Sequence, residues 1–304
     1  MLKQREVFMK TTGVIGLGDM GSGLAKNLIK NGFVTSGFDL SADRMAAFAA
    51  FGGNPKNSVA EVAAAADCVF VMVMNGDQAK SVILGDDGLV ANMARGGAVI
   101  LTATIKPTEA HSIANSMEGS GIDLIDSPVS GGFSGAENGA LTMMAAAPCD
   151  VLDANAPVMK AVSGTIHRVG DNAGDGQTVK ACLQTVIGSI FSATFEASAL
   201  AAKAGVRGDV LYNVLSTSGA GCGVANTALA HIIDREFEGT GSHIATMHKD
   251  LTISLDLAGE LGVPMQTASS AMQVFQAGKS KYPAGDNWVC TRIIEDIVGA
   301  ELHR

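Results

Sequence analysis

Residues 13–21 read Gly13-Val14-Ile15-Gly16-Leu17-Gly18-Asp19-Met20-Gly21, a G-x-G-x-x-G pattern between an apolar run and a helix-like stretch. In this context Gly16 permits a tight turn, Gly18 lets the backbone approach a pyrophosphate, and Gly21 lets helix and strand pack closely. The N-terminus of the helix also favours an anion. A purely structural glycine turn is the alternative for the motif taken alone. With its flanking elements, the stretch predicts a dinucleotide-binding site.

A second predicted strand, residues 34–38, ends directly before Asp39, which lies twenty-one residues after Gly18. An acid at this place binds the adenosine ribose hydroxyls and repels a ribose 2′-phosphate. The sequence therefore favours NAD, and the nearby Arg44 keeps NADP as an alternative; a strand-end or helix-capping role is the other interpretation of Asp39. The residues predicted to bind the cofactor are thus Gly16, Leu17, Gly18, Asp19, Met20, Gly21 and Asp39.

Short apolar runs alternate with helix-like stretches from residue 12 to about residue 169. The predicted strands are residues 13–15, 34–38, 68–74, 98–101, 122–125, 141–146 and 165–169. Continuous apolar runs of this kind are typical of a parallel sheet buried on both faces. After Gly174 only helical periods remain, broken by glycines and prolines. We predict an α/β Rossmann-type N-terminal domain over residues 11–172, followed over residues 173–304 by an all-α C-terminal domain for substrate binding and oligomerisation.

Composition narrows the classes of partner. The 304 residues carry a net charge of −9 without a basic stripe, so we expect no nucleic-acid partner. The five cysteines are scattered without metal-site spacing, and they predict reduced, mostly buried thiols. The six histidines show no metal-site spacing either, so we assign no metal.

Two segments bear on localisation. Residues 1–10 are charged and lack an apolar stretch of signal-peptide length, so they predict a short frayed extension of a cytoplasmic protein. Residues 185–202 are the most membrane-like segment, but Glu196 interrupts them and small residues dominate. We expect a buried helix there and no membrane partner.

Residues 126–143 form a second unusual segment, because small residues and glycines follow a predicted strand end. Ser130, Gly131 and Gly132 would present a hydroxyl and successive backbone N–H groups to a carboxylate. A flexible surface loop is the alternative.

Lys180 lies near the start of a run of about thirty residues, to Gly205, that is almost wholly apolar and predicts one long interdomain helix. A lysine near a helix start commonly extends its ammonium group to water. The other interpretation is an acid/base lysine, because a partly desolvated ammonium loses proton affinity.

Four ordered motifs resemble the β-hydroxyacid dehydrogenase family over residues 13–297. They are residues 16–21, residues 126–132, residues 174–180 and Lys249-Asp250-Leu251. The resemblance implies a Rossmann-type domain joined by a long helix to an all-helical domain. It also implies that Lys180 is the catalytic acid/base, that Ser130, Gly131 and Gly132 bind the substrate carboxylate, and that Met74, Asn75, Thr104 and Lys249 lie at the cofactor.

The chain departs from most family members at Gln184, where an asparagine is usual four residues after the lysine. At i, i+4 the amide still shares the helical face of Lys180, and we assign it to substrate binding. Lys-x-x-x-Gln, together with residues 74–79 after the third strand, resembles the L-threonate dehydrogenase branch. This implies an NAD-dependent oxidoreductase for a four-carbon sugar acid, with tartronate semialdehyde reductase or 3-hydroxyisobutyrate dehydrogenase activity as alternatives.

Three other classes remain open. A 6-phosphogluconate dehydrogenase shares both loops but resembles a much longer chain, an imine reductase typically lacks the Lys180 motif, and a dehydrogenase-like binding module would not need the lysine. The apolar long helix predicts a homodimer or homotetramer.

Overall fold

The structure is a computed structural model that describes residues 10–304, so residues 1–9 of the predicted N-terminal extension lie outside the described chain. The chain divides into two compact units, Met1–Lys180 and Ala181–Arg304. The sequence places the domain boundary at residues 172/173, before the long helix. The division lies within that helix, because residues 175–180 belong to the first unit.

The first unit is built on one nine-stranded sheet of order β3-β2-β1-β4-β5-β6-β8-β7, with β9 paired to β8. The strands are β1 (Thr12–Ile15), β2 (Thr35–Phe38), β3 (Asn54–Pro55), β4 (Cys68–Val71), β5 (Ala98–Leu101), β6 (Asp123–Asp126), β7 (Val129–Ser130), β8 (Leu141–Ala146) and β9 (Ser163–Gly170). The first six run parallel in the order 3-2-1-4-5-6, which is the doubly wound arrangement of dinucleotide-binding domains. The predicted Rossmann-type fold is therefore confirmed.

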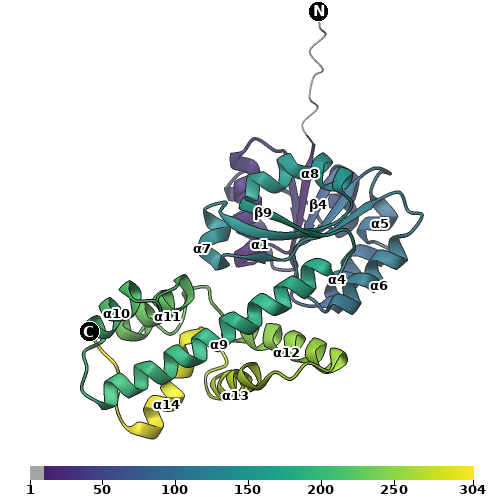
Figure 1. Ribbon diagram of the computed structural model, residues 1–304. Coiled ribbons are helices and arrows are strands. Elements are labelled where there is room, and N and C mark those ends of the chain that lie inside the picture. The colour runs from purple at the N-terminus through teal and green to yellow at the C-terminus, as the bar shows by residue number, and fades with distance from the viewer. Residues whose placement is uncertain (1–9) are drawn as a thin grey trace, which may run out of the picture. The chain divides into compact units, whose positions relative to one another are not determined.

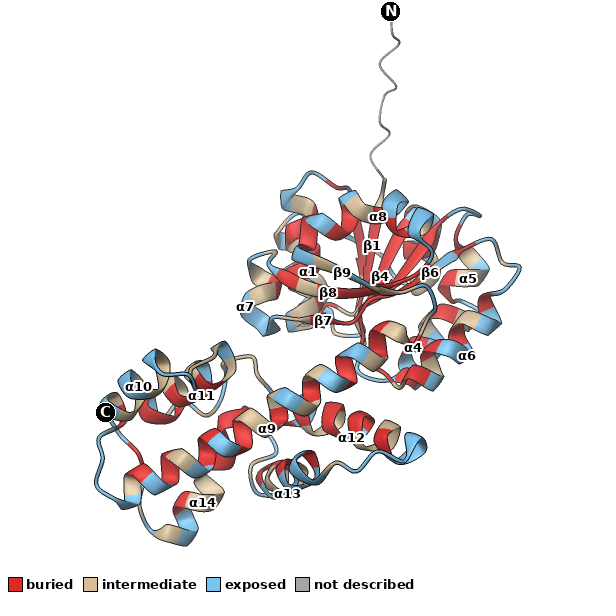
Figure 2. Cartoon of the chain, in the orientation of Figure 1, coloured by how far each residue is buried: buried red, intermediate tan, exposed pale blue. Residues whose placement is uncertain are grey.

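Before α9, eight helices in the described part of the chain lie on both faces of the sheet (Figure 1). They are α1 (Asp19–Lys30), α2 (Ala42–Ala50), α3 (Val59–Ala65), α4 (Gly76–Leu84), α5 (Leu89–Asn92), α6 (Pro107–Met117), α7 (Gly132–Glu137) and α8 (Cys149–Val162). Alternate residues of a strand point to opposite faces, so Val14 packs with α1 and α8 while Ile15 packs with α3 to α6. Figure 2 shows the central strands buried throughout, as the continuous apolar runs predict.

Three details differ from the sequence-based expectation. The sheet is mixed, because β8 pairs antiparallel with both β6 and β7. The apolar run 68–74 ends as a strand at Val71, since Asn75 directly afterwards caps α4 and turns the chain. The predicted loop 126–143 contains the short strand β7 and helix α7. The sequence shows that this segment is rich in glycine. It shows no helical period there, because α7 is only six residues long.

The second unit is helical, as predicted. Helix α9 (Asp175–Lys203) is followed by α10 (Gly208–Thr217), α11 (Gly223–Asp234), α12 (Ile244–Leu261), α13 (Gln266–Lys281), the 3₁₀ turn η1 (Asn287–Cys290) and α14 (Thr291–Val298). Its hydrophobic core contains Phe191 and Phe195 of α9, which pack with Phe275 and Trp288. By length and composition α9 would be able to cross a membrane, but its two phenylalanines are buried in this core, as in an interior helix.

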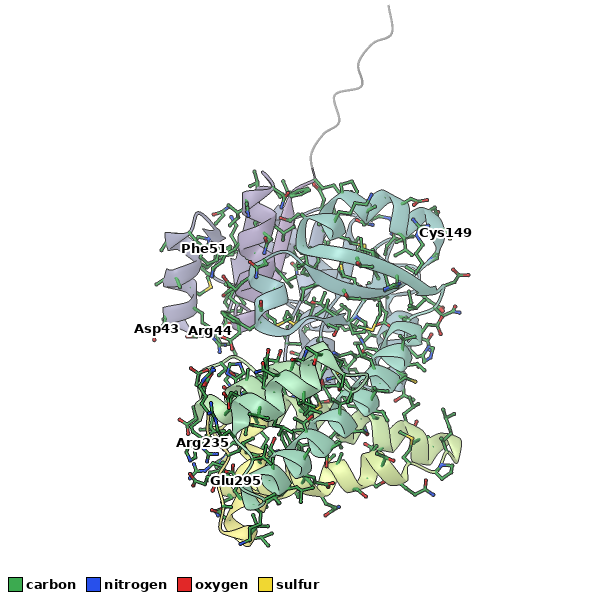
Figure 3. All side chains as sticks on the ribbon, turned by 60° about the vertical axis from the view of Figure 1, so that its left-hand side comes forward. Asp43, Arg44, Phe51, Cys149, Arg235 and Glu295 are labelled. Atoms are coloured by element: carbon green, nitrogen blue, oxygen red, sulfur yellow. The ribbon has the colours of Figure 1, made fainter. Side chains whose placement is uncertain are left out.

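The second unit contains a buried ion pair between Arg235 and Glu295. Arg235 donates two hydrogen bonds to Glu295, at 2.7 and 2.9 Å, and the carboxylate is only 2% exposed (Figure 3). Such bidentate pairing satisfies a buried charge that would otherwise oppose folding.

The cysteines differ in part from the expectation. All five are free, but only Cys68 and Cys290 are buried. Cys149 (Figure 3) and Cys182 are exposed, because each lies on the outward side of its helix. The prediction of mostly buried thiols is therefore wrong.

Candidate active site

The turn between β1 and α1 is shaped by two glycines whose positions exclude a side chain. Gly16 has φ +88°, and a Cβ there would lie 2.2 Å from the carbonyl oxygen of Met72. At Gly21 a Cβ would lie 1.8 Å from the carbonyl oxygen of Gly16. Both contacts are with backbone atoms, which cannot yield as a flexible side chain does. The two outer glycines of the motif thus permit the tight turn and the close packing of α1.

Gly18 has a different environment and leaves room for a ligand. It is the N-cap of α1, has φ −66°, and makes no side-chain capping bond. The nearest atoms to a Cβ at Gly18 would be those of the Arg44 guanidinium, at 3.7 Å. The first turn of α1 therefore offers backbone N–H groups beside a residue without a side chain. This arrangement fits the pyrophosphate of a dinucleotide.

Asp39, at the end of β2, is joined directly to the glycine turn. Its Oδ2 accepts a hydrogen bond from the backbone N–H of Leu17 at 2.7 Å, and its Oδ1 accepts one from Ser41 at 2.8 Å. The Arg44 guanidinium lies 3.5 Å from Oδ2. The side chain of Asp39 is 9% exposed, whereas that of Arg44 is 55% exposed. The acid is therefore fixed beside the turn, and the cation is the adaptable member of the pair.

The other loop residues have distinct local roles. Leu17 is buried and Met20 packs against the same core, while Asp19 is exposed in the first turn of α1. Asn75 caps α4 by accepting a hydrogen bond from the Gln78 N–H at 2.9 Å, and Met74 is 55% exposed. The contribution of Leu17 and Met20 to a cofactor site would therefore come from their backbone.

The segment proposed to bind a carboxylate lies at the end of β7. Ser130 is partly exposed, and Gly131 and Gly132 are exposed with φ of +126° and +59°. Residues other than glycine rarely adopt these angles. The segment therefore has backbone angles that glycine permits, and its backbone is exposed at both glycines.

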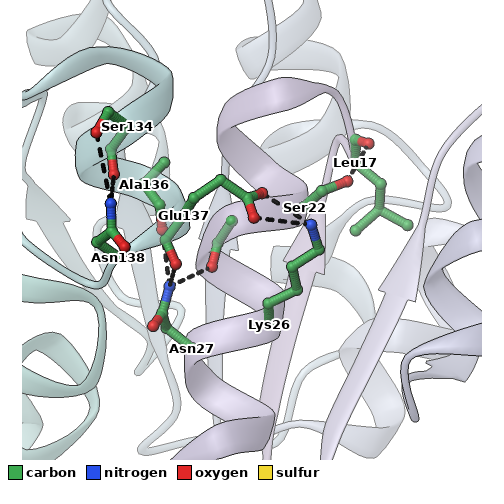
Figure 4. Close-up of polar contacts among 9 residues, drawn as sticks. Leu17, Ser22, Lys26, Asn27, Ser134, Ala136, Glu137 and Asn138 are labelled. Carbon is green, nitrogen blue, oxygen red and sulfur yellow. Dashed lines mark hydrogen bonds and ion pairs between the residues drawn. The ribbon is translucent and has the colours of Figure 1, made fainter.

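Helix α7, which follows this segment, is bound to α1, which follows the dinucleotide loop (Figure 4). The Asn27 side-chain amide donates to the carbonyl oxygens of Gly23 and Ala136, at 2.8 and 2.7 Å. Lys26 pairs with Glu137 at 2.8 Å. A Cβ on Gly23 would meet the Ala136 backbone at 2.7 Å, so the two helices pack with almost no separation. Contacts between α1 and α7 thus join the segment predicted to bind the cofactor to the segment predicted to bind the carboxylate.

Lys180 lies in the second turn of α9 and is 6% exposed. The interpretation in which its side chain extends into water does not agree with this burial. Gln184 lies one helical turn later and is also 6% exposed. Because α9 is continuous over both residues, they share one face of the helix.

Gln184 and Lys249 both contact Asp250 within the second unit. The Gln184 amide donates to Asp250 Oδ2 at 2.5 Å, and the Lys249 ammonium lies 2.9 Å from Asp250 Oδ1. Asp250 is 3% exposed, so its charge depends on these two partners. Sequence reasoning assigned roles to Gln184 and Lys249 but missed Asp250. The available signal was its position beside Lys249 in the fourth motif.

The start of α9 is bound to the end of β6 through a second buried acid. Asp126 accepts hydrogen bonds from the backbone N–H of Gly174 and from the backbone and side chain of Gln177. Burial raises the pKa of Asp126 to about 6, although those hydrogen bonds act to lower it. Thr104 lies in the loop after β5, which Gln177 also contacts through Ala103 and Ile105. Sequence reasoning did not single out either Asp126 or Gln177.

No cluster of three or more His, Cys, Asp and Glu side chains with metal-binding geometry occurs within residues 10–304. The groups described above are a buried lysine, buried amides and carboxylates, and exposed glycine backbone.

Two family models match the chain, one over each of its two parts. Residues 11–170 match the family model described as the NAD binding domain of 6-phosphogluconate dehydrogenase. Residues 174–292 match the model described as NAD-binding of NADP-dependent 3-hydroxyisobutyrate dehydrogenase.

Individual proteins are similar over nearly the whole chain. L-Threonate dehydrogenase of Escherichia coli O6:H1 is 33% identical, covering 94% of this chain and 95% of that protein. L-Threonate dehydrogenase of Cupriavidus necator is 32% identical, covering 96% and 98%. The crystal structure of a 3-hydroxyisobutyrate dehydrogenase from Salmonella typhimurium has a TM-score of 0.86 at 31% identity, covering 93% of this chain and 99% of that one. The chain therefore belongs to the β-hydroxyacid dehydrogenase family and is an NAD(P)-dependent hydroxyacid dehydrogenase.

Proposed function

We propose that this dehydrogenase acts on a four-carbon sugar acid, L-threonate, with Lys180 as the catalytic acid/base. The observation that carries the proposal is the pair of buried polar residues on one face of α9, Lys180 and Gln184. Two relatives that are 33% and 32% identical over almost all of the chain are L-threonate dehydrogenases, which supports this substrate. The Salmonella structure supports 3-hydroxyisobutyrate as the alternative.

The proposed roles follow from the chemistry of each group. When bound, the nicotinamide accepts a hydride from the substrate during oxidation or supplies one during reduction. Lys180 takes the hydroxyl proton in the oxidative direction and returns it in the reductive direction. Ser130, Gly131 and Gly132 bind the carboxylate through a hydroxyl and backbone N–H groups, and they thereby orient the reacting carbon.

We propose that NAD is the preferred cofactor. Gly16, Gly18 and Gly21 give the turn its shape, and Asp39 is fixed beside it with its charge next to the place expected for the adenosine ribose. A ribose 2′-phosphate would meet this carboxylate, and the Arg44 guanidinium would compensate for part of the repulsion. Thr104, Met74, Asn75 and Lys249 remain proposed cofactor residues.

The direct test is a panel of L-threonate, D-erythronate, glycerate, 3-hydroxyisobutyrate and 6-phosphogluconate, each assayed with NAD and with NADP by absorbance of the reduced cofactor. We expect the highest kcat/KM for L-threonate with NAD. A higher kcat/KM for 3-hydroxyisobutyrate would replace the substrate proposal. An absence of turnover on every acid would contradict the catalytic role.

We expect Gln184→Asn to change substrate preference. Removal of one methylene shortens the reach of the amide, so it cannot contact the substrate and keep its bond to Asp250 at the same time. In a shaped pocket such a change is worth roughly 10–200-fold in specificity, so we expect kcat/KM for L-threonate to fall by about this factor relative to 3-hydroxyisobutyrate. Steady-state kinetics on both acids measure the ratio.

The matched control is Gln276→Asn, which makes the same change at an exposed position of α13. It should leave the ratio unaltered. An unchanged ratio in Gln184→Asn as well would remove Gln184 from the substrate site.

We further propose that the protein is a cytoplasmic homodimer or homotetramer. The support for assembly is a set of exposed apolar side chains on α9 and α10, namely Val186, Leu200, Val210 and Val214. Light scattering on the purified protein measures the assembly state.

A further inference from the structure

A buried carboxylate and a buried amide connect three segments that the proposed function places at the active site. Asp126, the last residue of β6, is 0% exposed, and Gln177, in the first turn of α9, is 1% exposed. The Gln177 Nε2 donates to Asp126 Oδ1 at 2.7 Å. Ser130 to Gly132 follow Asp126 along the chain, and Lys180 follows Gln177.

The second oxygen of Asp126 holds the beginning of α9. Oδ2 accepts hydrogen bonds from the backbone N–H groups of Gly174, at 2.8 Å, and of Gln177, at 3.2 Å. These donors belong to the set that a helix start leaves without intrahelical partners. A Cβ on Gly176 would lie 2.6 Å from the Met144 carbonyl oxygen and 2.9 Å from that of Asp126. The first turn of α9 therefore rests directly on the ends of β6 and β8.

The amide of Gln177 connects this helix start to the loop that contains Thr104. Its Nε2 also donates to the Ala103 carbonyl oxygen at 3.1 Å, and its Oε1 accepts from the Ile105 N–H at 3.0 Å. Both amide donor positions and the amide oxygen are therefore in use. The residues on either side of Thr104 are bound to one side chain of α9.

Burial disfavours the charged form of the Asp126 carboxylate. Burial raises the pKa of Asp126 from 3.8 to about 6. A carboxyl group whose pKa is raised by folding favours the folded state below its unfolded pKa, and that contribution is lost as pH rises through the folded pKa. At neutral pH the burial of Asp126 thus opposes folding, and the hydrogen bonds from Gly174 and Gln177 offset part of this effect.

We propose that Asp126 and Gln177 are positioning residues, which hold the Thr104 loop, the Ser130–Gly132 segment and Lys180 in the arrangement that hydride and proton transfer require. This inference rests on the proposed function. Lys180 lies three residues after Gln177, so a fixed Gln177 fixes the turn that carries the lysine. A displacement of about 1 Å between reacting groups can lower a rate by about 10²-fold.

The test compares Asp126→Asn and Gln177→Met with the wild type, using the acid that the wild type oxidises fastest. The measurements are kcat per NADH-binding site, KM, the dissociation constant of NADH, and the primary isotope effect with substrate deuterated at its hydroxyl-bearing carbons. We expect kcat per site to fall by roughly 10–100-fold. The NADH dissociation constant should change little, and the isotope effect should increase because the chemical step becomes slower.

Asp67→Asn is the matched control. Asp67 also joins two segments of this sheet, since it accepts a hydrogen bond from the Thr11 backbone N–H at 2.8 Å. It precedes β4 and so lies at the opposite strand ends from Asp126. The control should keep kcat per site and the isotope effect of the wild type.

The outcomes are distinguishable. If Gln177→Met does not fold, Asp126→Asn decides the question, since it removes the charge with almost no change in shape. A lower yield of folded protein with unchanged kcat per site and unchanged isotope effect would overturn the positioning role. A wild type without turnover on any hydroxy acid would overturn the proposed function and the inference with it.

Discussion

Lys180→Met is expected to lower kcat for oxidation of L-threonate by roughly 10²–10⁴-fold, the usual contribution of a general acid/base. Methionine keeps an apolar stem of similar length but cannot carry the proton. Because Lys180 is 6% exposed, the stem has neighbours to retain, so we expect the variant to fold. NADH titration by fluorescence should give a dissociation constant close to that of the wild type.

The control for this prediction is Lys203→Met, in the last turn of the same helix. Lys203 donates to the Val298 carbonyl oxygen at 2.7 Å and belongs to none of the proposed site segments. Its kcat should remain that of the wild type. Turnover by Lys180→Met within a few-fold of the wild type would remove Lys180 from the acid/base role.

Gly18→Ala should weaken NAD binding by at least about tenfold, or about 1.4 kcal/mol, while the melting temperature stays close to that of the wild type. The backbone at Gly18 has φ −66°, which alanine adopts readily, and the nearest atom to a new Cβ is 3.7 Å away. The protein therefore has room for the methyl group. The pyrophosphate would not, because the motif requires close approach of the backbone at this glycine.

Gly21→Ala provides the contrast. Its Cβ would lie 1.8 Å from the Gly16 carbonyl oxygen, so we expect a clear fall in melting temperature. Gly259→Ala, in an uncrowded position of α12, should affect neither property. Differential scanning fluorimetry with and without NAD measures both effects. Wild-type NAD affinity in Gly18→Ala would contradict the placement of the pyrophosphate.

The sequence was most informative where function requires residues at fixed spacing along the chain. The glycine motif predicted the turn that Gly16 and Gly21 form, and the distance to Asp39 predicted the acid that now contacts the Leu17 N–H. Apolar runs located the seven main strands, and helical periodicity located α9. These features depend on local backbone geometry, which is determined by residues close together in the sequence.

Contacts between distant residues were not predictable in this way. Gln177 contacts Asp126 across 51 positions, and Gln184 contacts Asp250 across 66. Neither pair has a spacing rule, because the fold alone brings them together. Strand β8 was located, but its antiparallel pairing with β6 was not predicted, since an apolar run has no direction. Helix α7 was missed because two turns or fewer give too few residues for a period.

Hydride transfer between a hydroxy acid and the nicotinamide can be tested by following the hydride itself. L-Threonate deuterated at C2 and C3 is incubated with the protein and NAD, and the reduced cofactor is analysed by mass spectrometry and by NMR at nicotinamide C4. We predict one deuterium at C4 in the wild-type reaction and a greatly reduced rate of its appearance in Lys180→Met. Reduced cofactor without deuterium, or no reduced cofactor at all, would contradict this account.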